Sequence, residues 1–580
     1  MTNQLEHPIL VSQERRIADT IIKNAMVADV FNLQWRKANI VIADGMIVAI
    51  DEEDTFTAKT VEDAQGKFVI PGLIDGHIHI ESSMLTPSEF NRILVPHGIT
   101  SVVTDPHEIA NVSGTSGLQF MLDDAADAEM DIYIMLPSSV PGTSFENAGA
   151  VLKAKDLAPF IGHKDVIGLA EVMDFPAVLT ADTDMLEKIA MAQKASMVID
   201  GHGAGLKSSQ IRGYRVAGIH TDHECVSAEE AIDRVTQGMY VLMREGSAAK
   251  NVRDLLPAVT PANAHRFLFC TDDKHLDELI EQGSINYAVS LAIADGMEPI
   301  QAIQLATLNA ANCYRLFSKG ALAPGFVADI IVLENLETMK AGAVFKDGVK
   351  VAQEGRMLTE KKKGASLVAS ILESVHLPKI TEDDLTIPFE HSVRANVIEI
   401  MPNQLTTKKV ILDVPVVDGV FKPSVEQDLL KLAVVERHHH LGNIGLGIVT
   451  GFGLRKGAVA TTVAHDSHNA LVLGTNDADM IVALNALSEM QGGFVVVADG
   501  KVIGLMALPI GGLMTNLEAG SAEQELHALH EALHELNPEL DFHLFLTLSF
   551  ISLPVIPDVK LTDTGLFDVV AFQHIPIEVQ

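Results

Sequence analysis

The sequence predicts an α/β protein with three parts: a (β/α)8 TIM-like barrel, a small β-domain built from both segments that flank the barrel, and a C-terminal α+β domain. Two observations favour this fold class. Eight apolar runs each end near a polar residue, and successive polar ends lie 21 to 34 residues apart. That distance is typical of one strand, one helix and the two loops between them. Short β-prone runs also alternate with turns on both sides of the repeat.

The eight apolar runs are the predicted barrel strands. They span residues 68–74, 98–104, 131–136, 166–170, 196–199, 216–219, 239–243 and 267–270. A closed parallel barrel gathers the side chains that follow its strands at one mouth. The alternative is a doubly wound open sheet, in which polar strand ends are ordinary loop starts and have no reason to converge.

The flanking segments, residues 19–50 and 325–348, have the same alternation of short β-prone runs and turns, so we expect them to pair. The predicted domains are residues 1–70 for the first part of the small β-domain, 71–320 for the barrel, 321–375 for the second part and linker, and 380–580 for the C-terminal domain. The charged stretch 360–363 and the loop-like stretch 378–384 mark the last boundary.

Metal-ligand residue types follow several of these strands. His77 and His79 lie two residues apart, so a strand would direct both imidazoles to the same side. One such pair is a weak indication of a metal site. The later strand ends strengthen it, because they supply further ligand types in chain order: Glu171, His202, His223 and Asp272. Imidazole and carboxylate groups together suit manganese, iron or zinc.

Longer motifs carry a family resemblance. V-I-P-G-L-I-D-G-H-I-H at 69–79, A-T-L-N-A-A at 306–311 and L-A-P-G-x-x-A-D at 322–329 resemble the amidohydrolase superfamily. Within it, the chain resembles the adenine deaminase family in nearly its whole length, apart from roughly the first fifteen residues and the linker. The segments that carry this closer resemblance are 80–83, 105–108, 168–174, 244–249, 270–273, 465–469, 508–514 and 552–557.

The resemblance implies a centre of two divalent ions. In the superfamily pattern His77 and His79 bind one ion, His202 and His223 bind the second, and Glu171 bridges them. Many relatives have a carboxylated lysine at the bridging position, although some deacetylases also have a glutamate there. The implied cofactor is manganese or iron, with zinc a less favoured choice.

The implied reaction is hydrolytic deamination of adenine to hypoxanthine and ammonia by a metal-bound hydroxide. A bound ion lowers the pKa of water from about 15.7 towards about 7. The catalytic candidates are Asp272, His223 and Glu171; Asp272 can accept the water proton and pass it on, or act only as a metal ligand. His223 is chosen by the resemblance, and His220 and Glu224 beside it are alternatives.

Polar residues at the same mouth are candidates for recognition of the base. They are Glu81, Asp105, His107, Glu108, Ser138 and Ser139, together with Ser82, Ser83, Arg244 and Glu245. For each one, a helix cap or a loop hydrogen bond is the alternative role. In the C-terminal region, residues 436–440 and 465–469 form a histidine-rich cluster, which we interpret as a partly buried polar network in preference to a metal tract.

Two other functions stay open. One is an amidohydrolase that acts on an acetylated amine or a cyclic amide, and ammonia release from adenine separates it from the deaminase. The other is a non-catalytic barrel scaffold. A scaffold has no physical need to gather so many polar groups at one mouth, because burying them costs free energy.

Composition bounds the partners and the compartment. The net charge is −35, from 42 basic and 77 acidic residues, which disfavours a nucleic-acid partner. We expect no membrane partner, because the longest late apolar run, 542–556, is too short to span a bilayer. The three cysteines and a polar N-terminal segment suit a cytoplasmic enzyme acting on adenine and water. A homodimer or higher homo-oligomer is the expected assembly.

Overall fold

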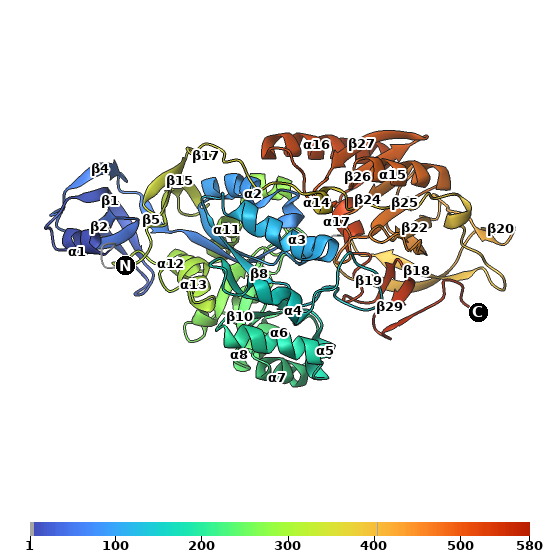
Figure 1. Cartoon of the computed structure of the whole chain (residues 1–580), viewed down its shortest axis with the longest axis horizontal. Helices are drawn as coiled ribbons and strands as arrows, with labels where there is room; N and C mark the ends of the chain where they lie inside the picture. The colour runs from blue at the N-terminus through green and yellow to red at the C-terminus, as the bar shows by residue number, and fades with distance from the viewer. Residues whose placement is uncertain (1–4, 403) are drawn as a thin grey trace.

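The computed structural model describes residues 5–402 and 404–580. Figure 1 shows a small β-domain at one end, a barrel in the middle and the C-terminal region at the other end. Parallel strands, outer helices and flanking sheets confirm the predicted fold class.

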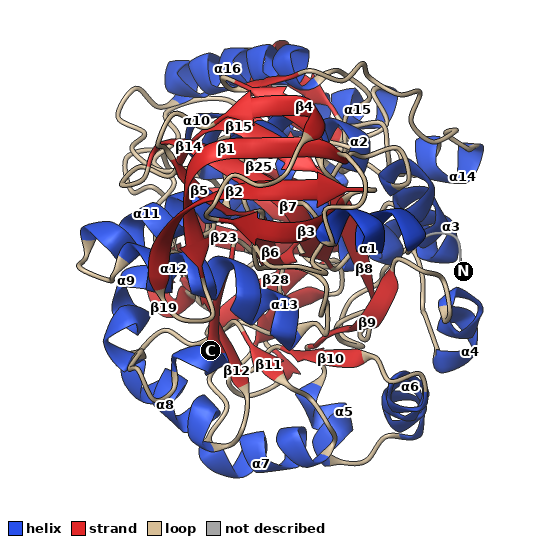
Figure 2. Cartoon of the chain, turned by 90° about the vertical axis from the view of Figure 1, so that its left-hand side faces the viewer, coloured by secondary structure: helices blue, strands red, loops and turns tan. Residues whose placement is uncertain are grey.

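The small β-domain is one mixed sheet, and Figure 2 shows it in front of the barrel. Both flanking segments contribute to it. They join where β14 runs antiparallel to β5, with Ile331 opposite Ile70. Apolar residues of both segments, including Ile40 and Ile330, pack into one core. The elements are α1 (Glu6–Ser12), β1 (Ala18–Asp29), β2 (Gln34–Ala43), β3 (Met46–Asp51), β4 (Ala58–Asp63), β5 (Phe68–Pro71), β14 (Ile330–Asn335), β15 (Lys340–Lys346), β16 (Val349–Gln353) and β17 (Arg356–Met357).

Parallel strands within residues 73–270 form the barrel. Strands β6 to β10 make one run and β11 to β13 a second. The runs meet at both edges, because His220 N–H donates to the Ile199 carbonyl at 2.9 Å and Asp272 N–H donates to the His77 carbonyl at 2.9 Å. The strands are β6 (Leu73–Ile78), β7 (Ile99–Thr104), β8 (Asp131–Leu136), β9 (Val166–Val172), β10 (Val198–Gly201), β11 (Thr221–Asp222), β12 (Tyr240–Arg244) and β13 (Phe267–Cys270).

The predicted first strand, 68–74, is wrong as a single element. Strand β5 ends at Pro71 in the small sheet, and the barrel strand β6 begins at Leu73. Gly72 makes the crossover possible, because a Cβ there would lie 2.1 Å from Thr100 Oγ1. Its N–H donates to the Asp329 carbonyl at 2.9 Å, which ties the crossover to the small domain.

The predicted strand 216–219 is also wrong. Helix α7 runs to Val216, whose side chain is 87% exposed. Gly218 then turns the chain with φ +99°, a conformation that glycine adopts without steric cost. The barrel strand is therefore short and begins at Thr221.

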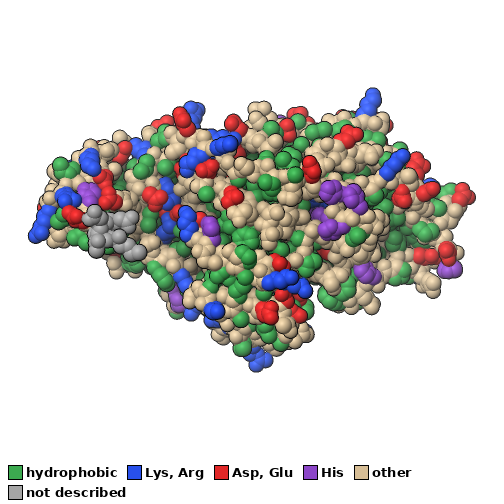
Figure 3. Space-filling view, in the orientation of Figure 1, with side chains coloured by type: hydrophobic (Ala, Val, Ile, Leu, Met, Phe, Trp, Pro, Cys, Tyr) green, Lys and Arg blue, Asp and Glu red, His purple; other side chains and the backbone are tan. Residues whose placement is uncertain are grey.

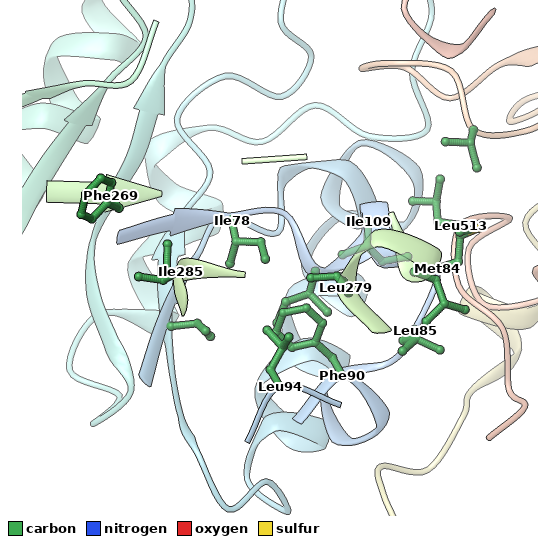
Figure 4. Packing of buried hydrophobic residues seen from close by; sticks show 14 of the residues in the cluster. Ile78, Met84, Leu85, Phe90, Leu94, Ile109, Phe269, Leu279, Ile285 and Leu513 are labelled. Atoms are coloured by element: carbon green, nitrogen blue, oxygen red, sulfur yellow. The ribbon is translucent and has the colours of Figure 1, made fainter. Parts of the chain in front are cut away.

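Helices cover the outside of the barrel. Figure 4 shows how Phe90 and Leu94 of α2, Leu279 of α10 and Ile285 of α11 lie in the apolar layer with Ile78 of β6. These helices are α2 (Pro87–Leu94), α3 (His107–Ala125), α4 (Ala154–Leu157), α5 (Phe175–Leu179), α6 (Thr183–Lys194), α7 (Ser208–Val216), α8 (Ala228–Thr236), α9 (Val252–Leu255), α10 (Leu276–Gln282), α11 (Ile285–Ala294), α12 (Pro299–Gln304) and α13 (Ala310–Cys313).

The C-terminal region is built on a second mixed sheet with the strand order β19-β18-β23-β22-β25-β24-β26-β27. Helices α15 and α16 pack on it. The strands are β18 (Arg394–Ile400), β19 (Thr407–Asp413), β20 (Val416–Val417), β21 (Val420–Phe421), β22 (Leu430–Val435), β23 (Ile444–Thr450), β24 (Ala458–Thr461), β25 (Ala470–Gly474), β26 (Gly493–Ala498), β27 (Lys501–Ala507), β28 (Val559–Thr562), β29 (Gly565–Asp568) and β30 (Gln573–His574). The helices are α14 (Ala369–Leu372), α15 (Asp477–Glu489), α16 (Ala519–Leu536) and α17 (Leu544–Ser549).

This region docks directly on the barrel. Asn147, in the long loop after β8, donates from its amide to Asp563 Oδ2 at 2.6 Å and from its backbone N–H to Asp563 Oδ1 at 3.0 Å. Thr515 N–H donates to the Met84 carbonyl at 2.8 Å. The two cores are therefore continuous, and Leu513 lies beside Met84 and Ile109 in Figure 4.

The surface carries both signs of charge. Figure 3 shows acidic and basic side chains interspersed on the face in view, so the net charge of −35 does not form a single patch there. Among the described residues, no helix is both long enough and apolar enough to cross a membrane.

Candidate metal centre

The six predicted ligands converge at the carboxyl ends of the barrel strands. His77 and His79 lie at the end of β6 and Glu171 in the last part of β9. His202 and His223 directly follow β10 and β11, and Asp272 lies two residues after the end of β13. All are buried except His202, which is half-buried. One cluster thus gathers residues nearly 200 positions apart in the chain.

Glu171 stands between two groups of histidines. Its Oε1 lies 3.2 Å from His79 Nε2 and 3.7 Å from His77 Nε2. Its Oε2 lies 2.7 Å from His202 Nδ1 and 3.4 Å from His223 Nε2. Each carboxylate oxygen therefore faces a different histidine pair.

Asp272 and Arg244 form the other side of the centre. Asp272 Oδ1 lies 3.1 Å from His79 Nε2, and Oδ2 accepts from Arg244 Nη1 at 2.6 Å. Arg244 also pairs with Glu224. Burial opposes ionisation of Asp272, but Arg244 and the nearby histidines hold its pKa well below the ordinary value. The carboxylate is thus kept ionised with one oxygen turned to the histidines.

The imidazoles are prepared for a metal ion. His79 Nδ1 donates to the Asp105 carbonyl at 2.9 Å, which turns Nε2 towards the centre. Against the effect of burial, Asp272 and Glu171 raise the pKa of His79 well above its ordinary value, so its Nε2 must release a proton to bind an ion. Burial, together with His223, lowers the pKa of His77 to about 4 and so favours its neutral form. His77 Nε2 lies 3.6 Å from Asp272 Oδ1 and 3.7 Å from Glu171 Oε1, is buried, and has no hydrogen-bond partner among the described residues. Unpaired, buried nitrogen atoms beside carboxylates fit divalent ions.

Glu224 also lies in the centre. Its Oε1 is 3.4 Å from His223 Nε2 and 3.9 Å from His202 Nδ1. Those three residues form one of the groups that could hold an ion. Sequence reasoning named Glu224 only as an alternative to His223, and its position directly after His223 was the available signal. His220, the other alternative, lies elsewhere: its backbone joins β10, and its pKa is lowered by burial and by Arg215.

Three of the predicted base-recognition residues follow the second barrel strand, β7, and Glu81 follows the first, β6, beside them. His107 Nδ1 lies 3.0 Å from Asp105 Oδ2 and 3.6 Å from Glu171 Oε1. Glu108 Oε1 accepts from Ser82 at 3.2 Å. Glu81 Oε1 accepts from the Ile109 N–H at 3.2 Å, and burial together with Glu108 raises its pKa to about 8.

Ser138 and Ser139 lie behind Glu171. Ser138 Oγ donates to the Glu171 carbonyl at 2.5 Å and lies 2.9 Å from Ser139 Oγ. Lys188 in turn donates to the Ser138 carbonyl at 2.8 Å. As far as the described cavities show, neither serine lines them. Their contacts support the strand end that carries Glu171.

The C-terminal region supplies residues to the same centre. His465 Nδ1 lies 3.2 Å from Glu108 Oε1, and Asp466 Oδ1 lies 3.7 Å from His107 Nε2. Both line a cavity of about 30 Å³ together with Glu171 and the other residues of the centre. Sequence reasoning missed this role and interpreted the cluster 465–469 as a buried polar network. The available signal was the resemblance of that segment, since periodicity says nothing about docking between domains.

Apolar residues of the C-terminal region complete the wall of the small cavity. They are Leu405, Phe550, Leu553, Val555 and Ile556. A larger cavity of about 1610 Å³ adjoins it and shares His202, Glu224 and Arg244 in its wall. The two cavities therefore adjoin at the centre, between the barrel and the C-terminal region.

The chain matches two family models. Residues 68–353 match the amidohydrolase family, and residues 404–573 match the adenine deaminase C-terminal domain. The first match contains every barrel residue of the centre, and the second contains His465 and Asp466.

Curated relatives match over the full length. An adenine deaminase of Lysinibacillus sphaericus is 66% identical over 575 residues, covering 99% of each chain. One of Geobacillus kaustophilus is 50% identical over 579 residues and covers 100% of both chains. One of Bacillus subtilis is 48% identical over 571 residues, covering 98% of each chain.

Solved structures match only part of the chain. An enamidase of the amidohydrolase superfamily has a TM-score of 0.45 and 21% identity, covering 60% of this chain and 100% of its own. A β-aspartyl dipeptidase from Fervidobacterium islandicum has a TM-score of 0.46 and 16% identity, covering 59% and 99%.

Proposed function

Because this chain belongs to the adenine deaminase family of the amidohydrolases, we propose that its centre removes the amino group of adenine by hydrolysis. The oxygen of water bonds to the ring carbon that carries the amine, and the carbon–nitrogen bond to the amine breaks. Adenine and water thus give hypoxanthine and ammonia. The reaction acts on a small molecule and needs no organic cofactor.

The position of the Glu171 carboxylate between two histidine pairs is the observation that supports this proposal. Its two oxygens face His77 and His79 on one side and His202 and His223 on the other. A carboxylate in that position can bridge two cations. The same centre lies in a chain that resembles adenine deaminases from end to end.

Members of this family use divalent metal, and the donor set is suited to it. His77, His79, His202 and His223 would hold two ions with Glu171 between them, and manganese or iron is our proposal for their identity. When bound, such ions lower the pKa of water towards about 7 and supply hydroxide at neutral pH.

Asp272 would handle the protons. Its Oδ1 faces the histidines, while Arg244 holds Oδ2 at 2.6 Å and keeps the group ionised. An ionised carboxylate at this position can accept a proton from the attacking water and deliver it to the ring or to the departing amine. Asp272 has φ +61°, a left-handed conformation that aspartate tolerates better than most residues.

The surrounding residues would orient the base and exclude water. His107 and Glu108 share the small cavity with the centre, so they are placed to contact the ring. Ser138 and Ser139 support Glu171 from behind. Phe550, Leu553 and Ile556 cover the mouth with apolar surface, which strengthens electrostatic interactions inside it.

We expect the Glu171→Gln variant to lose deaminase activity. The amide retains the size of the side chain but removes the charge and one of the two acceptor oxygens. Mutation of residues that only contact a metal ligand already lowers metal affinity or activity by about 10–100-fold. Removal of the bridging carboxylate should therefore lower kcat by more than ~100-fold. Ammonia release from adenine, after loading with manganese, measures the effect, and metal analysis of the same samples reports the loss of ions.

Glu146→Gln is the matched control. Glu146 is a buried carboxyl whose pKa is raised well above the ordinary value, first by burial and then by Asp466, so an amide resembles its neutral form. We expect near-normal activity from this variant. Absence of ammonia release from the manganese-loaded wild type would reject the deaminase proposal and direct the search to acetylated amines and cyclic amides.

A further inference from the structure

Asp466 is an acidic residue of the C-terminal region that reaches the metal centre. It is 4% exposed and lines the small cavity together with Glu171, Asp272 and His107. Its Oδ1 lies 3.7 Å from His107 Nε2. The proton transfers proposed above do not use it, so its place in this cavity calls for another role.

The second oxygen of Asp466 is free. Oδ2 is buried and has no hydrogen-bond partner among the described residues. Leaving a buried carboxylate oxygen unpaired is costly, so a ligand that donates to it would gain binding free energy. Gly142 of the neighbouring barrel loop lies close to this oxygen, because a Cβ at that position would lie only 3.0 Å from Oδ2. Gly142 itself lines the larger cavity that adjoins the centre.

Within a neutral base, a carboxylate oxygen can pair only with a hydrogen-bond donor. Apart from its amino group, adenine carries one ring N–H, and in the common tautomer this group is N9–H on the five-membered ring. The amino group must face Glu171 and Asp272 for the reaction. The N9–H then lies at the other end of the planar base, away from those two carboxylates.

We propose that Asp466 Oδ2 accepts the N9–H of the base and so selects free bases over bases substituted at that nitrogen. This inference rests on the proposed function and deepens it. A substituent at N9, such as a ribose or a methyl group, removes the donor and would crowd Gly142, which lies close to Oδ2. The C-terminal domain then determines specificity, while the barrel performs the chemistry.

The experiment compares adenine with 9-methyladenine in the manganese-loaded, full-length protein. A site that hydrogen-bonds a substrate N–H discriminates strongly against analogues that lack it, so the wild type should prefer adenine by ~10²-fold or more in kcat/KM. Asp466→Ala should lower kcat/KM for adenine by ~10–100-fold and change the value for 9-methyladenine by less than about threefold. The preference for adenine should therefore largely disappear.

A second variant tests the inference without removing the carboxylate. Gly142→Ala puts a methyl group beside Oδ2, and we expect it to weaken binding of adenine in the same direction as Asp466→Ala. The matched control is Asp563→Asn, which changes a carboxylate that docks the same two domains through Asn147 but lies outside the small cavity. It should leave the ratio between the two bases unchanged.

The outcomes separate the two proposals. A wild type that releases ammonia from adenine, with an Asp466→Ala variant that loses activity equally on both bases, would overturn the role of Asp466 in recognition. The same conclusion follows if Asp563→Asn changes the ratio as much as Asp466→Ala does. A wild type without deaminase activity would reject the proposed function; titration of adenine and 9-methyladenine by calorimetry would then still test whether Asp466 binds the N9–H.

Discussion

Lys560 shows how a single buried charge can influence the apolar wall that the C-terminal region adds to the small cavity, which we call its ceiling. Its ammonium group donates to the carbonyls of Leu405 at 2.7 Å and Phe550 at 3.0 Å, and both of those residues line the small cavity. Burial lowers its pKa from 10.5 to about 7, against a smaller opposing effect of Asp558. The lysine therefore joins two segments of the ceiling at the cost of a buried charge.

The pH dependence of stability follows from this pKa. Between pH 7 and 10.5 the unfolded chain binds a proton at Lys560 that the folded chain does not, so the free energy of unfolding should rise with pH in this window. Below pH 7 both states are protonated and the folded state bears the cost of burial. We expect the thermal midpoint of the wild type to rise relative to that of Lys560→Met as the pH rises from 7 to 10.

An exposed lysine provides the control for this measurement. Lys501→Met removes a charge from the surface at the start of β27 and should show no such pH-dependent gap. If the gap between wild type and Lys560→Met stays constant over the whole range, Lys560 does not titrate there.

At the scale of elements, the crossover at Gly72 joins the small β-domain to the barrel. The chain leaves β5 in one sheet and enters β6 in another within one residue, and Thr100 on β7 packs against the crossover. His77 and His79 follow a few residues later. The precise direction of β6, and with it the position of both imidazoles, depends on this close contact.

Gly72→Ala should destabilise the protein. Its Cβ would lie 2.1 Å from Thr100 Oγ1, so the strand must shift, at a cost of about 1–3 kcal/mol as for other overpacked sites. Thermal unfolding measures the loss. The comparison is Gly520→Ala in α16, where a Cβ has no atom of the described structure within 4 Å and alanine favours the helix. Equal midpoints for the two variants would contradict the steric argument.

At the scale of the whole molecule, the site is shared between the barrel and the C-terminal region. The barrel supplies the six candidate ligands, and the C-terminal region supplies His465, Asp466 and the apolar ceiling. The two parts therefore enclose the centre together, and their docking sets the shape of the cavity. The contact between Asn147 and Asp563 is part of this docking surface.

Asn147→Ala should loosen the docking. It removes the amide that donates to Asp563 Oδ2 at 2.6 Å and leaves a buried carboxylate oxygen unpaired, a loss of about 1–3 kcal/mol. We expect faster hydrogen exchange in residues 543–557 and a higher KM for adenine. Asn32→Ala is the control. It removes a hydrogen bond from a side-chain amide to Asp29 in the small β-domain and should leave both quantities unchanged. Unchanged exchange in Asn147→Ala would show that other contacts suffice for docking.

The predicted domain boundaries near residues 70, 320 and 380 stay predictions, as does the homo-oligomeric state. Proteolysis at the linker and a mass measurement in solution address them directly.

The sequence alone determined the repeat of strands and helices and the residue types at the mouth of the barrel. Both are local properties: strand ends follow from apolar runs, and the separation of His77 and His79 by one residue places them on one side of a strand. The ordered ligand types from His77 to Asp272 could therefore be predicted before any contact was known. The pairing of the two flanking segments followed from their matching β-prone patterns.

Only the tertiary structure decided how the parts meet. The crossover at Gly72 depends on a contact with Thr100, and the short β11 depends on a turn at Gly218, so neither appears in the apolar pattern. Ser138 faces the backbone of Glu171, whereas Asp466 reaches the cavity from nearly 300 residues further along the chain. Contacts between distant segments arise from packing of whole domains, and the periodicity of a single segment contains no information about that packing.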